Sequence, residues 1–194
     1  MPPRRLSAVA VYCGSNRGAD PAYAAAAATL GRLLAEREIR LVYGGGHVGL
    51  MGVLADSVLD SGGHALGVIT RALDAREVGH RGLTSLIVVE TMHERKAAMA
   101  DVADAFIMLP GGYGTLDEFF EVVTWTQLGI HAKACGLLDV AGYYTPLRAQ
   151  LDAAVRDGFV IPAHRELVIT ESEPGTLLDR LATWAPVTVS KWVD

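Results

Sequence analysis

The chain has few cysteines. Only Cys13 and Cys135 occur among its 194 residues, and both lie in apolar segments. Two isolated thiols are too few for a disulfide framework and lack the spacing of a zinc site. We therefore expect both thiols to be buried and reduced, as in a cytoplasmic protein.

Long apolar runs and concentrated basic charge are also missing. No apolar run reaches the roughly 18 residues that would span a bilayer, and the short run at 6–11 is not followed by an export cleavage site. The net charge is −5 with scattered basic residues, whereas nucleic-acid binding needs a basic patch. The sequence thus predicts no membrane and no nucleic-acid partner.

What the sequence does contain is a regular alternation of apolar runs and helical patterns. The length suits a single domain spanning 1–194. The predicted strands cover residues 6–13, 39–43, 65–69, 85–89, 105–109, 134–138 and 166–169. The predicted helices cover residues 21–37, 49–61, 92–102, 116–128, 144–157 and 174–182. Continuously apolar strands need both faces buried, so the pattern predicts an α/β fold, a Rossmann-like doubly wound parallel sheet with helices on both faces.

Glycine clusters follow three of the predicted strands, at 13–15, 43–46 and 109–112. In an open α/β sheet, ligands bind beyond the carboxyl ends of the strands, so we expect these clusters to share one rim. Residues 70–83 depart from the alternation and form an excursion that could cover this rim.

The segment 110–118 follows a strand and opens a helix, so its glycines let backbone amides face an anion. It lacks the Gly-Lys-Ser/Thr of a P-loop and the third glycine of a dinucleotide fingerprint. Glu118 has two equal interpretations. Thr115-x-x-Glu118 has the spacing of a capping box, yet a carboxylate beside a phosphate loop is also well placed for chemistry.

A second motif occupies residues 91–96. Thr91-x-x-Glu94 again fits a capping box, so a helix should begin at Met92. Arg95 then shares a mostly apolar face with Met92 and Met99. Either its guanidinium meets a carboxylate or phosphate, or it snorkels from the edge of the core, and the apolar face favours snorkelling.

The remaining signals are weaker. The loop 44–52 has more glycines than close helix–strand packing requires. Tyr113 and Trp125 could line a base pocket, although a lone aromatic on a helix is usually part of the core. The six histidines are dispersed, so no metal site is predicted.

Taken together, these motifs resemble the Lonely Guy family of cytokinin-activating phosphoribohydrolases. The similarity rests on 110–118, preceded by 92–96 and followed by 124–131, and it extends from 13–15 through 44–52 to about residue 138. Members of the family were often labelled lysine decarboxylases, but nothing in this sequence suggests a pyridoxal phosphate site.

The resemblance implies hydrolysis of the N-glycosidic bond of cytokinin riboside 5′-monophosphates, and of AMP, to free base and ribose 5-phosphate. It implies a homodimer that needs no cofactor. The rival hypothesis is a non-catalytic nucleotide or molybdenum-cofactor carrier of related fold, which would not need both Arg95 and Glu118.

The resemblance also assigns residues. Arg95 and Glu118 match the family's catalytic arginine and glutamate, and Asp117 stands where many members have a second glutamate. The positions that match substrate-binding residues are Gly14, Ser15, Gly45, Gly46, Glu77, Met92, Lys96, Gly111, Gly112, Tyr113, Gly114, Thr115 and Thr124.

Overall fold

A computed structural model describes residues 5–76 and 79–186. Its centre is a seven-stranded sheet in the order β4-β3-β2-β1-β5-β6-β7, with every neighbouring pair parallel. The strands are β1 (Ala8–Tyr12), β2 (Arg40–Tyr43), β3 (Ala65–Thr70), β4 (Ser85–Val89), β5 (Ala105–Met108), β6 (Ala134–Leu138) and β7 (Val168–Glu171). The predicted fold class is confirmed.

Helices connect the strands. They are α1 (Pro21–Glu36), α2 (Gly49–Asp60), α3 (Arg71–Asp74), α4 (Met92–Val102), α5 (Tyr113–Gln127), η1 (Val140–Gly142), α6 (Thr145–Arg156), α7 (Pro162–Arg165) and α8 (Pro174–Thr183). In the described residues, no helix is both long and apolar enough to cross a membrane.

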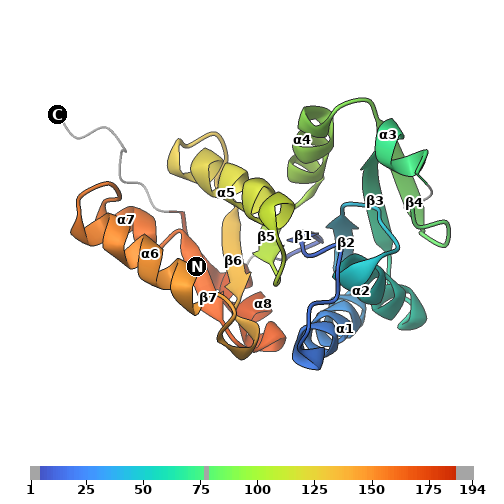
Figure 1. Cartoon of the computed structure of the whole chain (residues 1–194), viewed down its shortest axis with the longest axis horizontal. Helices are drawn as coiled ribbons and strands as arrows, with labels where there is room; N and C mark the ends of the chain where they lie inside the picture. Colours follow the sequence, from blue (N-terminus) through green and yellow to red (C-terminus); the bar gives the residue numbers. More distant parts are fainter. Residues whose placement is uncertain (1–4, 77–78, 187–194) are drawn as a thin grey trace.

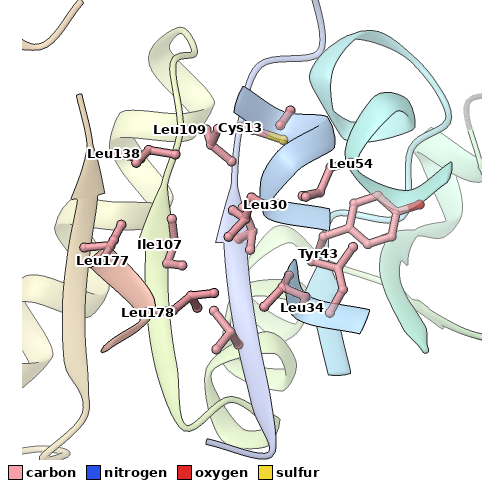
Figure 2. Packing of buried hydrophobic residues seen from close by; sticks show 14 of the residues in the cluster. Cys13, Leu30, Leu34, Tyr43, Leu54, Ile107, Leu109, Leu138, Leu177 and Leu178 are labelled. Carbon is pink, nitrogen blue, oxygen red and sulfur yellow. The ribbon is translucent and has the colours of Figure 1, made fainter. Parts of the chain in front are cut away.

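The sheet separates two hydrophobic cores because successive side chains of a buried strand point to opposite faces. In β1, Val9 and Val11 belong to one core, whereas Ala10 and Tyr12 belong to the other. The first core lies under α1, α2 and α8, where the side chains labelled in Figure 2 converge. The second lies under α4, α5 and α6 on the opposite face (Figure 1).

The strand order reverses beside β1. The chain runs outward from β1 through β2 and β3 to β4, and α4 then returns it to β5 on the other side of β1. The two loops at the carboxyl ends of β1 and β5 therefore leave the sheet in diverging directions. This is the switch point at which doubly wound folds bind ligands.

All but one of the predicted boundaries agree with the structure to within two residues. The last strand is Val168–Glu171 rather than 166–169, because the short helix α7 ends only at Arg165. Helix α5 begins at Tyr113, three residues before the predicted start, with Gly112 as its N-cap.

Candidate active site

The three glycine clusters do meet on one rim, as predicted. The Gly14 amide donates a hydrogen bond to the Pro110 carbonyl at 3.0 Å, and the Leu50 amide donates to the Gly14 carbonyl, also at 3.0 Å. Gly14 thus ties the loop after β1 to the loop after β5 and to the start of α2. A cavity of about 250 Å³ lies between these loops, lined by Ser15 and Gly111 among others.

The start of α5 offers backbone amides to this rim. Its first helical hydrogen bond runs from the Leu116 amide to the Gly112 carbonyl at 3.1 Å. The amides of Tyr113, Gly114 and Thr115 precede that bond, so they have no acceptor within the helix. A β-carbon on Gly112 or Gly114 would meet nothing within 4 Å. Unpaired amides at a helix start with open space around them suit an anion.

The turn before α5 requires a glycine. Thr115 is buried, and a β-carbon on Gly111 would overlap its Oγ1 atom. It would also lie 2.9 Å from the Gly14 amide nitrogen. Gly111 therefore lets the two loops approach each other, and this close approach gives the loop after β5 its shape.

Arg95 and Glu118 form a buried ion pair close behind the start of α5. Nη1 of Arg95 donates to Oε1 of Glu118, and Nε of Arg95 donates to the Val68 carbonyl at 2.9 Å. Arg95 is 6% exposed and Glu118 9%. Pairing offsets much of the cost of burying either charge alone.

This geometry decides the two open alternatives. Glu118 is the sixth residue of α5 and the N-cap is Gly112, so Glu118 takes no part in capping, and the capping-box interpretation is wrong. The snorkelling interpretation of Arg95 is wrong as well, because its guanidinium points inward to a carboxylate. At α4 the predicted cap is confirmed, since Oγ1 of Thr91 accepts from the Glu94 amide at 3.1 Å.

Burial raises the pKa of Glu118 above that of a solvated glutamate. The charge and hydrogen bond of Arg95 act in the opposite direction and do not cancel the effect. A carboxylate with a raised pKa holds a proton more tightly than usual, which suits a group that must take a proton from water near neutral pH.

Gly44 makes room for the arginine. A β-carbon at this position would overlap Nη2 of Arg95. Two neighbours in the same loop, Gly45 and Gly49, have positive φ angles of 74° and 63°. The glycines of this loop therefore serve local geometry, and one of them serves the ion pair directly.

Lys96 adds a second set of charges next to the pair. Its Nζ atom lies 3.1 Å from Oδ2 of Asp117 and 3.2 Å from Oε1 of Glu121. Burial lowers the pKa of Lys96, but the hydrogen bonds and the charges of the two carboxylates together raise it by more. The sequence prediction did not include Glu121, although its spacing of three residues from Glu118 places both on neighbouring turns of α5.

Other predicted residues lie in the loop after β1, at the start of α4 and in the loop after β2. Ser15 lies in the loop after β1, and Met92 begins α4 with Lys96 one turn further on. Gly45 and Gly46 contact the predicted excursion, since the Gly45 carbonyl accepts from the His80 amide at 2.8 Å and Gly46 pairs with Gly79.

Two of the remaining predicted residues, Tyr113 and Thr124, are exposed, and Glu77 lies outside the described residues. Tyr113 is 94% exposed at the first position of α5. Thr124 is exposed two turns beyond Glu118, and its hydroxyl donates to the Phe120 carbonyl at 2.7 Å.

Across residues 5–76 and 79–186, no group of three or more His, Cys, Asp or Glu side chains could hold a metal ion. The groups that this rim offers to a ligand are backbone amides, Arg95, Lys96 and carboxylates.

Comparison with known proteins places the chain in a family. The model of the family described as "Possible lysine decarboxylase" matches residues 51–181. Over 182 residues the chain is 48% identical to the Arabidopsis thaliana cytokinin riboside 5′-monophosphate phosphoribohydrolase LOG7, covering 94% of this chain and 84% of that protein. The chain belongs to the Lonely Guy family. The Oryza sativa subsp. japonica member LOG is also 48% identical, over 94% of this chain and 75% of its own length.

Solved structures support the fold of this Lonely Guy family member. A molybdenum cofactor binding protein from Rippkaea orientalis superposes with a TM-score of 0.70 at 21% identity, covering 92% of this chain and 97% of that one. The molybdenum cofactor carrier protein of Chlamydomonas reinhardtii gives 0.69 at 16% identity, covering 93% and 100%. At such identities the likeness concerns the fold alone.

Proposed function

We propose that this chain hydrolyses the N-glycosidic bond of cytokinin riboside 5′-monophosphates, and of AMP, to release free base and ribose 5-phosphate. The observation that carries the proposal is the buried Arg95–Glu118 pair beside the helix start that faces an anion. The relatives named as phosphoribohydrolases support the same reaction.

In this proposal the nucleotide lies along α5. The 5′-phosphate binds the amides of residues 112–115, and the ribose reaches Glu118 about one turn further on, roughly 5 Å along the helix axis. The base continues toward the next turns of α5. There Thr124 shares a stripe of the helix with Asp117 and Glu121, the two partners of Lys96.

Breaking the bond between C1′ and N9 leaves positive charge on the ribose, as in glycoside hydrolysis. Glu118 stabilises that charge and takes a proton from the water that attacks C1′. Arg95 holds this carboxylate in position. Its own position is fixed by a second hydrogen bond, which its Nε donates to the Val68 carbonyl. The electrons of the broken bond leave with the base, which takes up one proton as Glu118 takes one from water, so the products are neutral free base and ribose 5-phosphate.

The deciding experiment is to incubate the purified protein with isopentenyladenosine 5′-monophosphate and with AMP, and to measure free base by chromatography. We expect release from both. A folded protein that releases no base from either would rule the proposal out. Tight binding of a pterin ligand without cleavage of any nucleotide would instead favour a carrier, in line with the structural neighbours.

We further propose that the chain is a single cytoplasmic domain that works as a homodimer. The family resemblance supports the dimer, and so does Thr124, which matches a substrate-binding position but is exposed far along α5 from the phosphate loop. The two buried free thiols support the cytoplasmic compartment. Light scattering of the purified protein and fractionation of cells that express it test the assembly and the compartment separately.

A further inference from the structure

Two consecutive tyrosines hold the loop after β5. The Tyr143 hydroxyl donates a hydrogen bond to the Gly111 carbonyl at 2.8 Å, and the Tyr144 hydroxyl donates to the Leu109 carbonyl at 2.7 Å. Both tyrosines come from the turn between β6 and α6, which lies outside every motif recognised in the sequence. The phosphate loop is therefore fixed from a segment about 30 residues away.

That turn has an uncommon backbone. Ala141 and Gly142 have φ angles of 51° and 71°, in the left-handed region. For a residue with a β-carbon this costs on the order of 1 kcal/mol. Buried Asp139 secures the turn by accepting a hydrogen bond from the Tyr144 amide at 2.7 Å. Strain of this kind persists where the structure around it is fixed, and it often marks functional sites.

The bond from Tyr143 fixes the direction of an amide. Described peptide bonds are all trans, and in a trans peptide unit the carbonyl and the N–H point in opposite directions. Tyr143 binds the carbonyl of the unit that joins Gly111 to Gly112. The N–H of Gly112 consequently points away from Tyr143. A β-carbon on Gly112 would meet nothing within 4 Å, so there is open space around this residue.

The polar groups of the preceding peptide unit, which joins Pro110 to Gly111, both face other parts of the protein. Its Pro110 carbonyl accepts from the Gly14 amide, and its Gly111 N–H interacts with the Tyr144 hydroxyl. The N–H of Gly111 therefore faces the interior of the protein. The N–H of Gly112 is turned outward, next to those of Tyr113 and Gly114. A row of three amides is the arrangement that binds phosphate oxygens at helix starts.

We propose that Tyr143 is a positioning residue for phosphate recognition, because its hydroxyl turns the Gly112 amide toward the 5′-phosphate of the substrate. The proposal rests on the proposed function only in naming that phosphate as the anion. Tyr143 does not itself touch the reacting atoms. Its ring is held by Tyr23, which packs edge-on with ring centroids 5.5 Å apart, so the ring can stay in place without its hydroxyl.

The test is the variant Tyr143→Phe, which removes only the hydroxyl. We expect the KM for AMP and the Ki of inorganic phosphate each to rise about three- to tenfold, the size of one lost hydrogen bond, while kcat stays within twofold. Inorganic phosphate is informative because it has no ribose or base to contact other parts of the site. Tyr23→Phe is the matched control, since its hydroxyl makes no hydrogen bond with this loop in the described residues, and it should leave KM and Ki unchanged.

A folded Tyr143→Phe protein with unchanged KM and Ki would overturn the proposal, as would an equal change in Tyr23→Phe. A lower Tm with unchanged phosphate affinity would also overturn it, because Tyr143 would then serve only the stability of the fold. If the wild-type protein cleaves no nucleotide, calorimetry with inorganic phosphate still decides. A weaker Kd in Tyr143→Phe would then support the positioning role although the proposed function had failed.

Discussion

The guanidinium of Arg95 occupies the space that a side chain on Gly44 would fill. A β-carbon at Gly44 would overlap Nη2 of the arginine, whose other nitrogens bind the Glu118 carboxylate and the Val68 carbonyl. The strand end at β2 and the ion pair between α4 and α5 are therefore built to fit one another.

Gly44→Ala should displace Arg95 and separate it from Glu118. We expect kcat/KM to fall at least tenfold, because a shift of about 1 Å at a reacting group costs that much or more. Overpacking should lower the free energy of unfolding by about 1–3 kcal/mol. Steady-state kinetics and urea denaturation measure the two effects.

Gly175→Ala is the matched control. This glycine lies in α8, where a β-carbon would meet its nearest neighbour at 3.7 Å, an ordinary contact. Activity should be unchanged, and stability unchanged or slightly higher, because alanine favours the helix. Full activity in Gly44→Ala would show that the arginine does not need its present position.

Glu118→Gln tests the carboxylate while preserving its size. Glutamine can still accept a hydrogen bond from Arg95, but it can neither take a proton nor carry the negative charge that the proposed mechanism places beside the ribose. We expect kcat to fall about 10²- to 10⁴-fold with AMP binding largely retained, as measured by calorimetry. Glu36→Gln, which changes an exposed carboxylate on α1, is the control. Retained turnover would leave Glu118 with a structural role only.

The sheet was predictable because its signal is local. Continuous apolar runs placed the strands at 85–89 and 134–138 at the boundaries that the structure has. Glycines at the carboxyl ends then located the rim, since all parallel strands end on the same side.

Local sequence patterns gave the wrong result for the cap at Thr115 and for the partner of Arg95. Thr91-x-x-Glu94 is a true cap and Thr115-x-x-Glu118 is not, although the two spacings are identical. The difference is that the chain leaving β5 turns into helix already at Tyr113, despite the low helix propensity of glycine. The partner of Arg95 lies 23 residues away in another βα unit, and helical periodicity carries no information about it.

Lys96→Met should weaken nucleotide binding rather than chemistry. The lysine is buried between Asp117 and Glu121, one position after Arg95, so its charge offsets two carboxylates beside an anionic substrate. Its loss removes a charge-assisted contact, and we expect KM for AMP to rise about tenfold or more with kcat changed less than threefold. Arg32→Gln, which removes an exposed charge on α1, should change neither. A lower kcat at constant KM would contradict this role.

The pH profile of kcat/KM, which reports the pKa values of the free enzyme, should reveal the buried glutamate. In the proposed mechanism Glu118 acts as the carboxylate, so activity should be lost as pH falls through its pKa. Burial raises that pKa, and the acid limb should therefore have its midpoint above about 4.3, the value for a solvated glutamate. Measuring kcat/KM for AMP between pH 4 and 8 gives the midpoint, and circular dichroism at each pH separates it from acid unfolding. A midpoint at or below that of a solvated glutamate, in folded protein, would mean that Arg95 outweighs burial and that Glu118 is a weaker base than its surroundings indicate.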